Sequence, residues 1–486
     1  MIKKNKNLKL KFTEFTFFQH CFFAQIIPLC LYIILAMFGG FCRWDQGFII
    51  VGADLIKRGK IPIKDFMCIV TPLTFYIQSI LQKLFYPLNA IIISRFWKGC
   101  LTSIVCFCFL FYLKRFLSYF GTENFPLSFI YIFSIFFMLV GACQEPFAFY
   151  TTDSLFFATL GILLISFIYR KKRHFDFIGY FLLGMSFCCK QDIGIASLIC
   201  GVTYIVFRFF LKIFKRSDFS YISIILSFFF LFLAPFLMFS CLFFNGISFH
   251  DMFYWFFIIP SKIKRSLPII FLSLLTFSSC QLDIREKWFL FLSLFLSLFC
   301  LYGFIKNRWI TIRRMYWIIL FFLFLFLIFI FCFIKNINLY YYFFIVVPKL
   351  IDHVLLVYQI SSVAYFLFVF STIILFFYLF FLLKKRINLQ LLLHFFMPIL
   401  LFLLVLNFSL LTGTHNVRLY RNIVPLCFAG TLSWLVFFKL SAKDKKINFA
   451  LLNSFFCSLA LIFLLVRING IFSGTFAEPL KSKIIY

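Results

Sequence analysis

Long apolar runs alternate with short polar connections along most of the chain. A transmembrane helix needs about 20 consecutive, mostly apolar residues, and most of these runs reach that length. The pattern therefore predicts an all-α polytopic membrane protein with about thirteen transmembrane helices. The runs cover residues 21–41, 89–113, 125–143, 153–169, 177–189, 193–211, 221–244, 288–305, 316–335, 360–383, 391–411, 421–440 and 449–468.

Basic clusters mark alternate connections between these runs and predict the orientation of the helices. Cytoplasmic loops carry an excess of Lys and Arg, so the lysine-rich segment 1–11 is expected in the cytoplasm. If the C-terminus lies outside, every later cluster also faces the cytoplasm. This topology requires the stretch 267–280 to be re-entrant or to lie on the outer face. These clusters fall at residues 114–115, 170–173, 212–216, 306–314, 384–386 and 439–446.

The composition excludes a soluble protein, because 64% of the 486 residues are hydrophobic and only 13% are charged. The net charge of +31 would suggest a nucleic-acid partner on a soluble chain. Here the positive residues gather in the connections, so they indicate topology, and we expect no nucleic-acid partner. We expect one membrane domain over residues 1–486. The 17 cysteines include no C-x-x-C pair, although Cys42 and Cys68 could form a disulfide in the first outer loop.

The first outer loop, residues 42–88, is too long for a simple hairpin between helices and too amphipathic to span the bilayer. Apolar and charged residues share the segment 51–60, which is typical of a short helix lying in the membrane interface. Gly59 ends this helix, and Pro72 opens a second segment, 73–85, with apolar residues at helical spacing. We therefore predict two interfacial helices that hold the loop against the outer leaflet.

Asp45 is the first candidate for chemistry, because most acidic residues of the predicted topology lie at or beyond the outer face. It follows the first span by a few residues and stands beside Trp44. A carboxylate in partly shielded, low-dielectric surroundings can serve as a general base. The alternative is an aspartate that only ends a helix.

Three segments of this loop, WDQGF, ADLIKRGKIPIKDF and TPLTFY, resemble the first periplasmic loop of the GT-C superfamily of glycosyltransferases. This superfamily uses polyprenyl-phosphate sugars and includes protein mannosyltransferases, aminoarabinose transferases and lipopolysaccharide galacturonosyltransferases. Asp45 matches the loop aspartate of the family, which the resemblance implies is the catalytic base or positions the acceptor. The family commonly has an acidic residue where this chain has Gln46, so the resemblance does not extend to a paired carboxylate. Residues that match the scaffold of the loop are Gly59, Pro62, Asp65, Pro72 and Tyr76.

The resemblance implies further site residues at the outer ends of later spans. Asp153 matches a second acidic residue at the start of a span, with Glu145 as its substitute. The alternative is that Asp153 only caps the helix. Lys190 belongs to a K-Q-x-x-G turn that recurs in the family, and its alternative is a lysine that snorkels to the interface.

Basic residues near the outer face would suit the phosphate of a lipid-linked donor, because a cation there neutralises charge that lipid cannot solvate. For the loop 244–287, contact with anionic lipid competes with contact to the donor phosphate. For the loop 412–422, contact with the donor is the hypothesis. The candidates are Arg95 early in the second span, Lys262, Lys264 and Arg265 in the first of these loops, and His415, Arg418 and Arg421 in the second.

The resemblance implies an integral membrane hexosyl- or pentosyltransferase. It would move a sugar from a polyprenyl-phosphate donor to a lipid, glycan or protein acceptor. Its expected place is the bacterial cytoplasmic membrane, with the active site facing the periplasm or the exterior. Some relatives bind a divalent metal ion through loop acidic residues, but no ligand set in this sequence demands one. Two alternatives remain: a polymerase or ligase of lipid-linked polysaccharide, and a flippase or transporter of lipid-linked sugars.

Overall fold

The computed structural model describes residues 2–37, 45–119, 126–143, 148–167, 174–213, 221–260 and 431. Every regular element in this part of the chain is a helix. Four of the described helices contain segments long and apolar enough to cross a membrane, at Thr16–Ile34, Ala90–Arg115, Gln191–Phe210 and Tyr221–Phe244. The described part is therefore consistent with an α-helical membrane protein. The predicted spans from residue 288 onward lie outside it, apart from residue 431, so the total of about thirteen and the single domain stay predictions.

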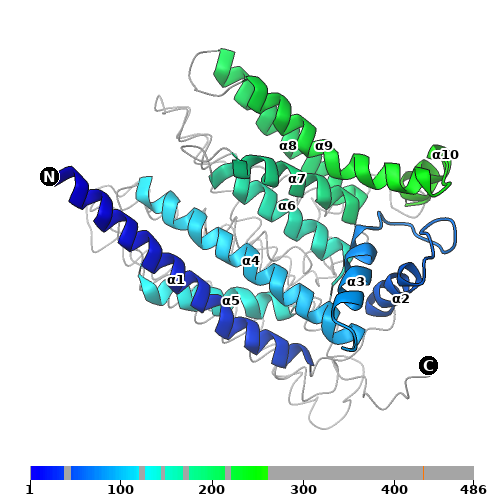
Figure 1. The fold of residues 1–486 in the computed structure, drawn as a ribbon, viewed down its shortest axis with the longest axis horizontal. Helices are drawn as coiled ribbons and strands as arrows, with labels where there is room; N and C mark the ends of the chain where they lie inside the picture. The colour runs from blue at the N-terminus through cyan, green and yellow to red at the C-terminus, as the bar shows by residue number, and fades with distance from the viewer. Residues whose placement is uncertain are drawn as a thin grey trace, which may run out of the picture.

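The long helices pack in two groups that meet along one contact (Figure 1). In the first group α1 (Ile2–Met37) and α4 (Ala90–Tyr119) pack on α5 (Leu127–Cys143). The second group contains α6 (Tyr150–Phe167), α7 (His174–Cys189), α8 (Gln191–Ile213) and α9 (Tyr221–Phe244), and α4 contacts α6 to join the groups.

Small residues allow the helices of the second group to approach closely. A Cβ atom added to Gly161 of α6 would lie 2.8 Å from the carbonyl oxygen of Gly179 in α7. Membrane helices commonly pack through such small residues, because apolar lipid gives no hydrophobic drive for association. We infer that a side chain at either glycine would push α6 and α7 apart.

Four shorter elements lie together at one end of the helices, which we name the loop end (Figure 1). They are α2 (Asp45–Lys57), α3 (Leu73–Leu84), α10 (Phe249–Phe253) and the π-helical turn η1 (Tyr254–Ile258). Both helices predicted for the first loop are formed, although α2 begins before residue 51, and their position at the membrane interface stays a prediction. Gly59 follows α2 with a φ of +80°, a conformation that L side chains rarely adopt, and this turn ends the helix as predicted.

A small apolar core fixes the first loop on the helix ends. Ile49 of α2, Phe75 of α3 and Phe149 beside α6 are all buried in it, together with Cys68 and Val70. The first loop also reaches the end of α9, because the Lys64 Nζ donates a 3.2 Å hydrogen bond to the Asn245 carbonyl.

The opposite end of the second group contains a buried ion pair. Arg208 near the end of α8 contacts Asp176 in the first turn of α7, with 2.6 Å between Nη2 and Oδ2. The guanidinium carbon also lies 5.1 Å from the ring centroid of Tyr204. Buried charges need such partners, and this pair holds α7 to α8 far from the loop end.

The helix boundaries correct one expectation. Asp153 was expected at the capping position of its span, but α6 begins at Tyr150. The Asp153 N–H donates to the Phe149 carbonyl at 2.8 Å, so Asp153 lies within the first turn rather than ahead of it. Its side chain is therefore not the cap that an aspartate before a helix provides.

Candidate functional site

Asp153 presents a buried carboxylate to the first loop. The side chain is fully buried, and the Thr74 hydroxyl of α3 donates a 3.1 Å hydrogen bond to its Oδ2. Its Oδ1 is buried and has no hydrogen-bond partner among the described residues. An acidic group is costly at such a position, which makes it a candidate for function.

Lys98 of α4 lies near enough for its charge to act on this carboxylate. It is fully buried, and its positive charge acts favourably on Asp153. Its Nζ also lies 4.2 Å from the ring centroid of Phe156, one turn further along α6. Sequence reasoning missed this residue. The available signal was a lysine inside the apolar run 89–113, whose other charged residue is Arg95.

Arg95 lies one turn before Lys98 on α4 and contacts the start of α2. Its Nη2 donates a 3.3 Å hydrogen bond to Oε1 of Gln46, and both side chains are buried. Asp45 is the first residue of α2 and directly precedes Gln46. The structure thus places the candidate Arg95 against the helix turn that begins with the candidate Asp45, whose own side chain lies outside the described part.

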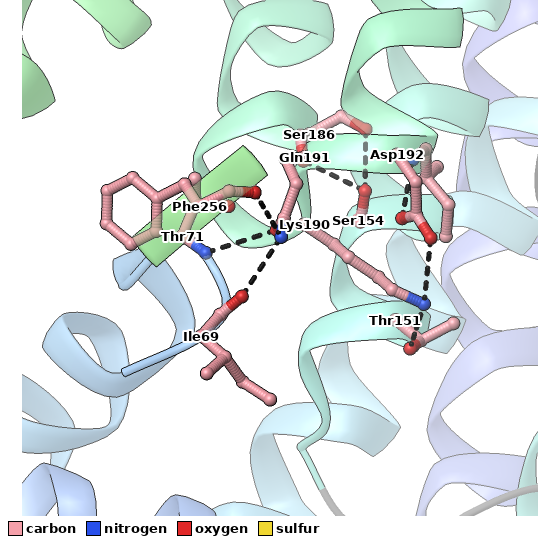
Figure 2. Close-up of polar contacts among 10 residues, drawn as sticks. Ile69, Thr71, Thr151, Ser154, Ser186, Lys190, Gln191, Asp192 and Phe256 are labelled. Atoms are coloured by element: carbon pink, nitrogen blue, oxygen red, sulfur yellow. Dashed lines mark hydrogen bonds and ion pairs between the residues drawn. The ribbon is translucent and has the colours of Figure 1, made fainter. Parts of the chain in front are cut away.

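Lys190 occupies the junction between α7 and α8 (Figure 2). Only 8% of its surface is exposed. Its Nζ donates a 3.0 Å hydrogen bond to the Thr151 hydroxyl and lies 3.5 Å from Oδ2 of Asp192. The alternative of a snorkelling lysine is therefore wrong, because the ammonium group is directed into a buried polar contact.

Gln191 connects three segments at the loop end (Figure 2). Its Nε2 donates to the carbonyl of Ile69 at 3.0 Å and to the carbonyl of Phe256 at 2.9 Å. Its Oε1 accepts from the Thr71 N–H at 3.4 Å, and the Thr71 hydroxyl donates to the Phe187 carbonyl at 2.7 Å. The Gln191 side chain thus holds together the first loop, the junction of α7 and α8, and η1.

A line of serines fixes the helices beneath these contacts. Ser186 of α7 lies between Ser154 of α6 and Ser197 of α8, with Oγ–Oγ distances of 2.9 Å on each side. All three are buried. Hydroxyl chains of this kind satisfy polar groups that lipid cannot, so they set the helix positions that carry Asp153 and Lys190.

The structure thus brings three of the predicted residues, Arg95, Asp153 and Lys190, to contacts at the loop end. The sequence did not reveal Thr74 and Gln191, because their partners lie far away along the chain. The remaining candidates lie outside the described residues and stay predictions. These are Glu145, Lys262, Lys264, Arg265, His415, Arg418 and Arg421.

No metal centre is seen in the described part of the chain, where no three His, Cys, Asp or Glu side chains gather. The first loop nevertheless contains a thiol in a distinct environment. Cys68 is free and buried, and its thiol donates to the Val70 carbonyl at 3.0 Å. Its expected partner Cys42 lies outside the described residues, so a disulfide between the two stays a prediction. Burial raises the pKa of Cys68 to about 12.

Comparison of the chain with protein-family models, with curated proteins and with solved structures finds no match.

Proposed function

We propose that this membrane protein is a glycosyltransferase that moves a sugar from a polyprenyl-phosphate donor to a lipid, glycan or protein acceptor. One observation supports the proposal above the others. The buried Asp153 carboxylate lies at the loop end, receives a hydrogen bond from α3, and is balanced by the charge of Lys98. The resemblance of the first loop to GT-C enzymes implies an acidic site at this position in the fold.

The reaction assigns one role to each charged group. Asp45 removes the proton of the acceptor hydroxyl as its oxygen attacks the anomeric carbon of the donor sugar. The bond from the anomeric carbon to the phosphate oxygen breaks, and the polyprenyl phosphate leaves with the electron pair. A direct displacement of this kind inverts the anomeric centre.

Cations at the loop end stabilise the leaving phosphate, whose charge increases in the transition state. Arg95, Lys98 and Lys190 supply buried positive charge in the described part. Asp153, which the Thr74 hydroxyl holds in place, balances that charge before the donor binds. The basic residues of the loops 244–287 and 412–422 are further candidates for donor contact, and the proposed site faces the periplasm or the exterior.

The test is sugar transfer in reconstituted membranes from a panel of labelled polyprenyl-phosphate sugars. Wild type is compared with Asp45→Asn, and we expect transfer to fall at least about a hundredfold, in the range of an acid–base residue. The matched control is Asp54→Asn in the same helix. Asp54 lies on the surface and pairs with Arg58 at 2.8 Å, so its loss should leave transfer unchanged.

Two outcomes contradict the proposal. Unchanged transfer by Asp45→Asn would mean that Asp45 only begins α2. Failure of wild type to transfer any sugar, while labelled lipid crosses the bilayer, would identify a transporter instead.

A further inference from the structure

The helix α3 buries a polar face. Thr74, Gln78 and Gln82 recur every four residues on this helix, so they form one stripe, and all three are buried. Phe75 is buried beside the stripe, whereas Ile80 and Leu84 are 56% and 71% exposed, as suits a helix that lies against lipid. The stripe lies on the side of α3 that contacts the protein, because α3 packs on α2, α4, α6 and α7. The buried amides of the stripe therefore need hydrogen-bond partners on that side.

The amides of this stripe lack hydrogen-bond partners. Among the residues that the structure describes, neither polar atom of the Gln78 side chain has a partner, and Nε2 of Gln82 has none. Gln46 on the neighbouring helix α2 is similar, because its Oε1 accepts from Arg95 while its buried Nε2 has no partner. Buried polar groups are nearly always paired, since leaving them unpaired is costly. Several unpaired amides in one place indicate that another molecule completes them.

The stripe ends at the candidate reaction centre. Thr74, its first member, donates to the Asp153 carboxylate, whose Oδ1 is also buried without a partner. Gln46 directly follows Asp45, the proposed base. The unpaired amides therefore lie on the two loop helices that also carry the contacts to the proposed catalytic groups.

The chemistry of the stripe selects among the parts of a lipid-linked substrate. An amide offers donors and acceptors without charge, as a sugar hydroxyl does. A phosphate needs cations, and a prenyl chain would leave the amides unpaired. We propose that Gln46, Gln78 and Gln82 bind the hydroxyl groups of an uncharged sugar. The proposal rests on the proposed function, because it assigns the sugar half of the donor to these residues.

The experiment measures binding to the full chain in lipid nanodiscs. The probes are undecaprenyl phosphate alone and undecaprenyl phosphate carrying glucose, mannose, arabinose or galacturonic acid. We expect wild type to bind at least one uncharged sugar lipid about tenfold more tightly than undecaprenyl phosphate, the gain from about one hydrogen bond. Gln78→Met should abolish this preference and leave the affinity for undecaprenyl phosphate unchanged, and Gln82→Met should weaken the preference.

The matched control is Gln25→Met in α1. Gln25 is also a buried amide, but its Nε2 donates to Ser134 at 2.8 Å within the first helix group, so its replacement should not change sugar preference. Gln82→Met provides the second variant if Gln78→Met fails to fold, because it removes the other amide of the stripe and keeps a side chain of similar length.

Three results overturn the inference. The first is wild type without a preference for any sugar lipid over undecaprenyl phosphate, and the second is a preference for galacturonic acid. The third is a wild-type preference kept by Gln78→Met and Gln82→Met together with a higher unfolding temperature, which identifies unpaired amides without a ligand. Transfer assays on the same samples separate the two proposals. If the glutamine variants transfer sugar and keep the wild-type sugar preference, this inference is overturned and the proposed function stands. Sugar preference without transfer overturns the proposed function alone.

Discussion

The Thr74 hydroxyl donates a 3.1 Å hydrogen bond to the Asp153 carboxylate across the boundary between the first loop and the helix bundle. Both side chains are buried, so water does not compete for the contact. Through this bond, a displacement of α3 changes the surroundings of Asp153. The relationship makes Thr74 a positioning residue, whose role differs from that of the acid itself.

We expect Thr74→Val to lower sugar transfer by about tenfold to a hundredfold, because Asp153 loses its donor and its geometry. Thr74→Ser keeps the hydroxyl and should restore most of the activity. The measurement is kcat and KM for donor transfer in reconstituted membranes. Full activity in the valine variant would show that the hydrogen bond does not matter, and equal losses in both variants would show that the hydroxyl alone does not account for the effect.

The pairing of Lys98 with Asp153 predicts a coupled effect on stability. Lys98→Met leaves the buried carboxylate without its positive partner, a change that typically costs about 3–5 kcal/mol. The double variant Lys98→Met with Asp153→Asn should be more stable than Lys98→Met alone, because the uncompensated charge is gone. Thermal unfolding of the four proteins in detergent measures this cycle. Additive losses would mean that the two charges do not interact.

The positions of the apolar helices could be predicted from the sequence, because each follows an apolar run. Helices α4 to α9 coincide with predicted runs to within a few residues, and three of them, α4, α8 and α9, are long and apolar enough to cross a membrane. The two loop helices were also predictable from Gly59 and Pro72, which fix where a helix can end or begin. Local signals were sufficient for these elements.

The partners within the site could not be predicted, because they depend on packing between distant segments. Lys98 is visible as a charge in an apolar run, but nothing local connects it to Asp153. The stripe of Gln78 and Gln82 follows helical spacing, yet the side of α3 that becomes buried depends on its contacts with four other helices. The sequence suggested that Asp153 caps its helix, because aspartate is common at the capping position. In the structure α6 begins earlier, at Tyr150, so Asp153 lies inside the helix.

The Gln191 contacts predict that one side chain holds the first loop in place. Gln191→Leu leaves the Ile69 and Phe256 carbonyls and the Thr71 N–H without their partner, so local opening should become easier. We expect amide hydrogen exchange of the segment 69–71 to accelerate at least about tenfold, which corresponds to about 1.4 kcal/mol of local stability. Mass spectrometry of deuterated peptides measures this change.

The control for this variant is Gln82→Leu, because Gln82 is a buried glutamine of the same loop whose Nε2 has no partner to lose. Its exchange in the segment 69–71 should match wild type. Slow exchange in Gln191→Leu would show that the apolar core around Phe75 is sufficient to hold the loop. Equal acceleration in both variants would indicate general loosening of the loop end.

The environment of Cys68 predicts a pH dependence of its reactivity. Burial raises its pKa to about 12, so the thiol stays protonated at neutral pH, and the thiolate is the reactive form. Iodoacetamide should therefore modify Cys68 slowly at pH 7.5 and faster as the pH rises toward the pKa. A cysteine introduced by Lys60→Cys at an exposed position of the same loop should react at the rate of an ordinary thiol. Mass spectrometry of the two peptides measures both rates in one sample. Equal rates at pH 7.5 would contradict the buried position, and a peptide joined to Cys42 would show that the disulfide forms.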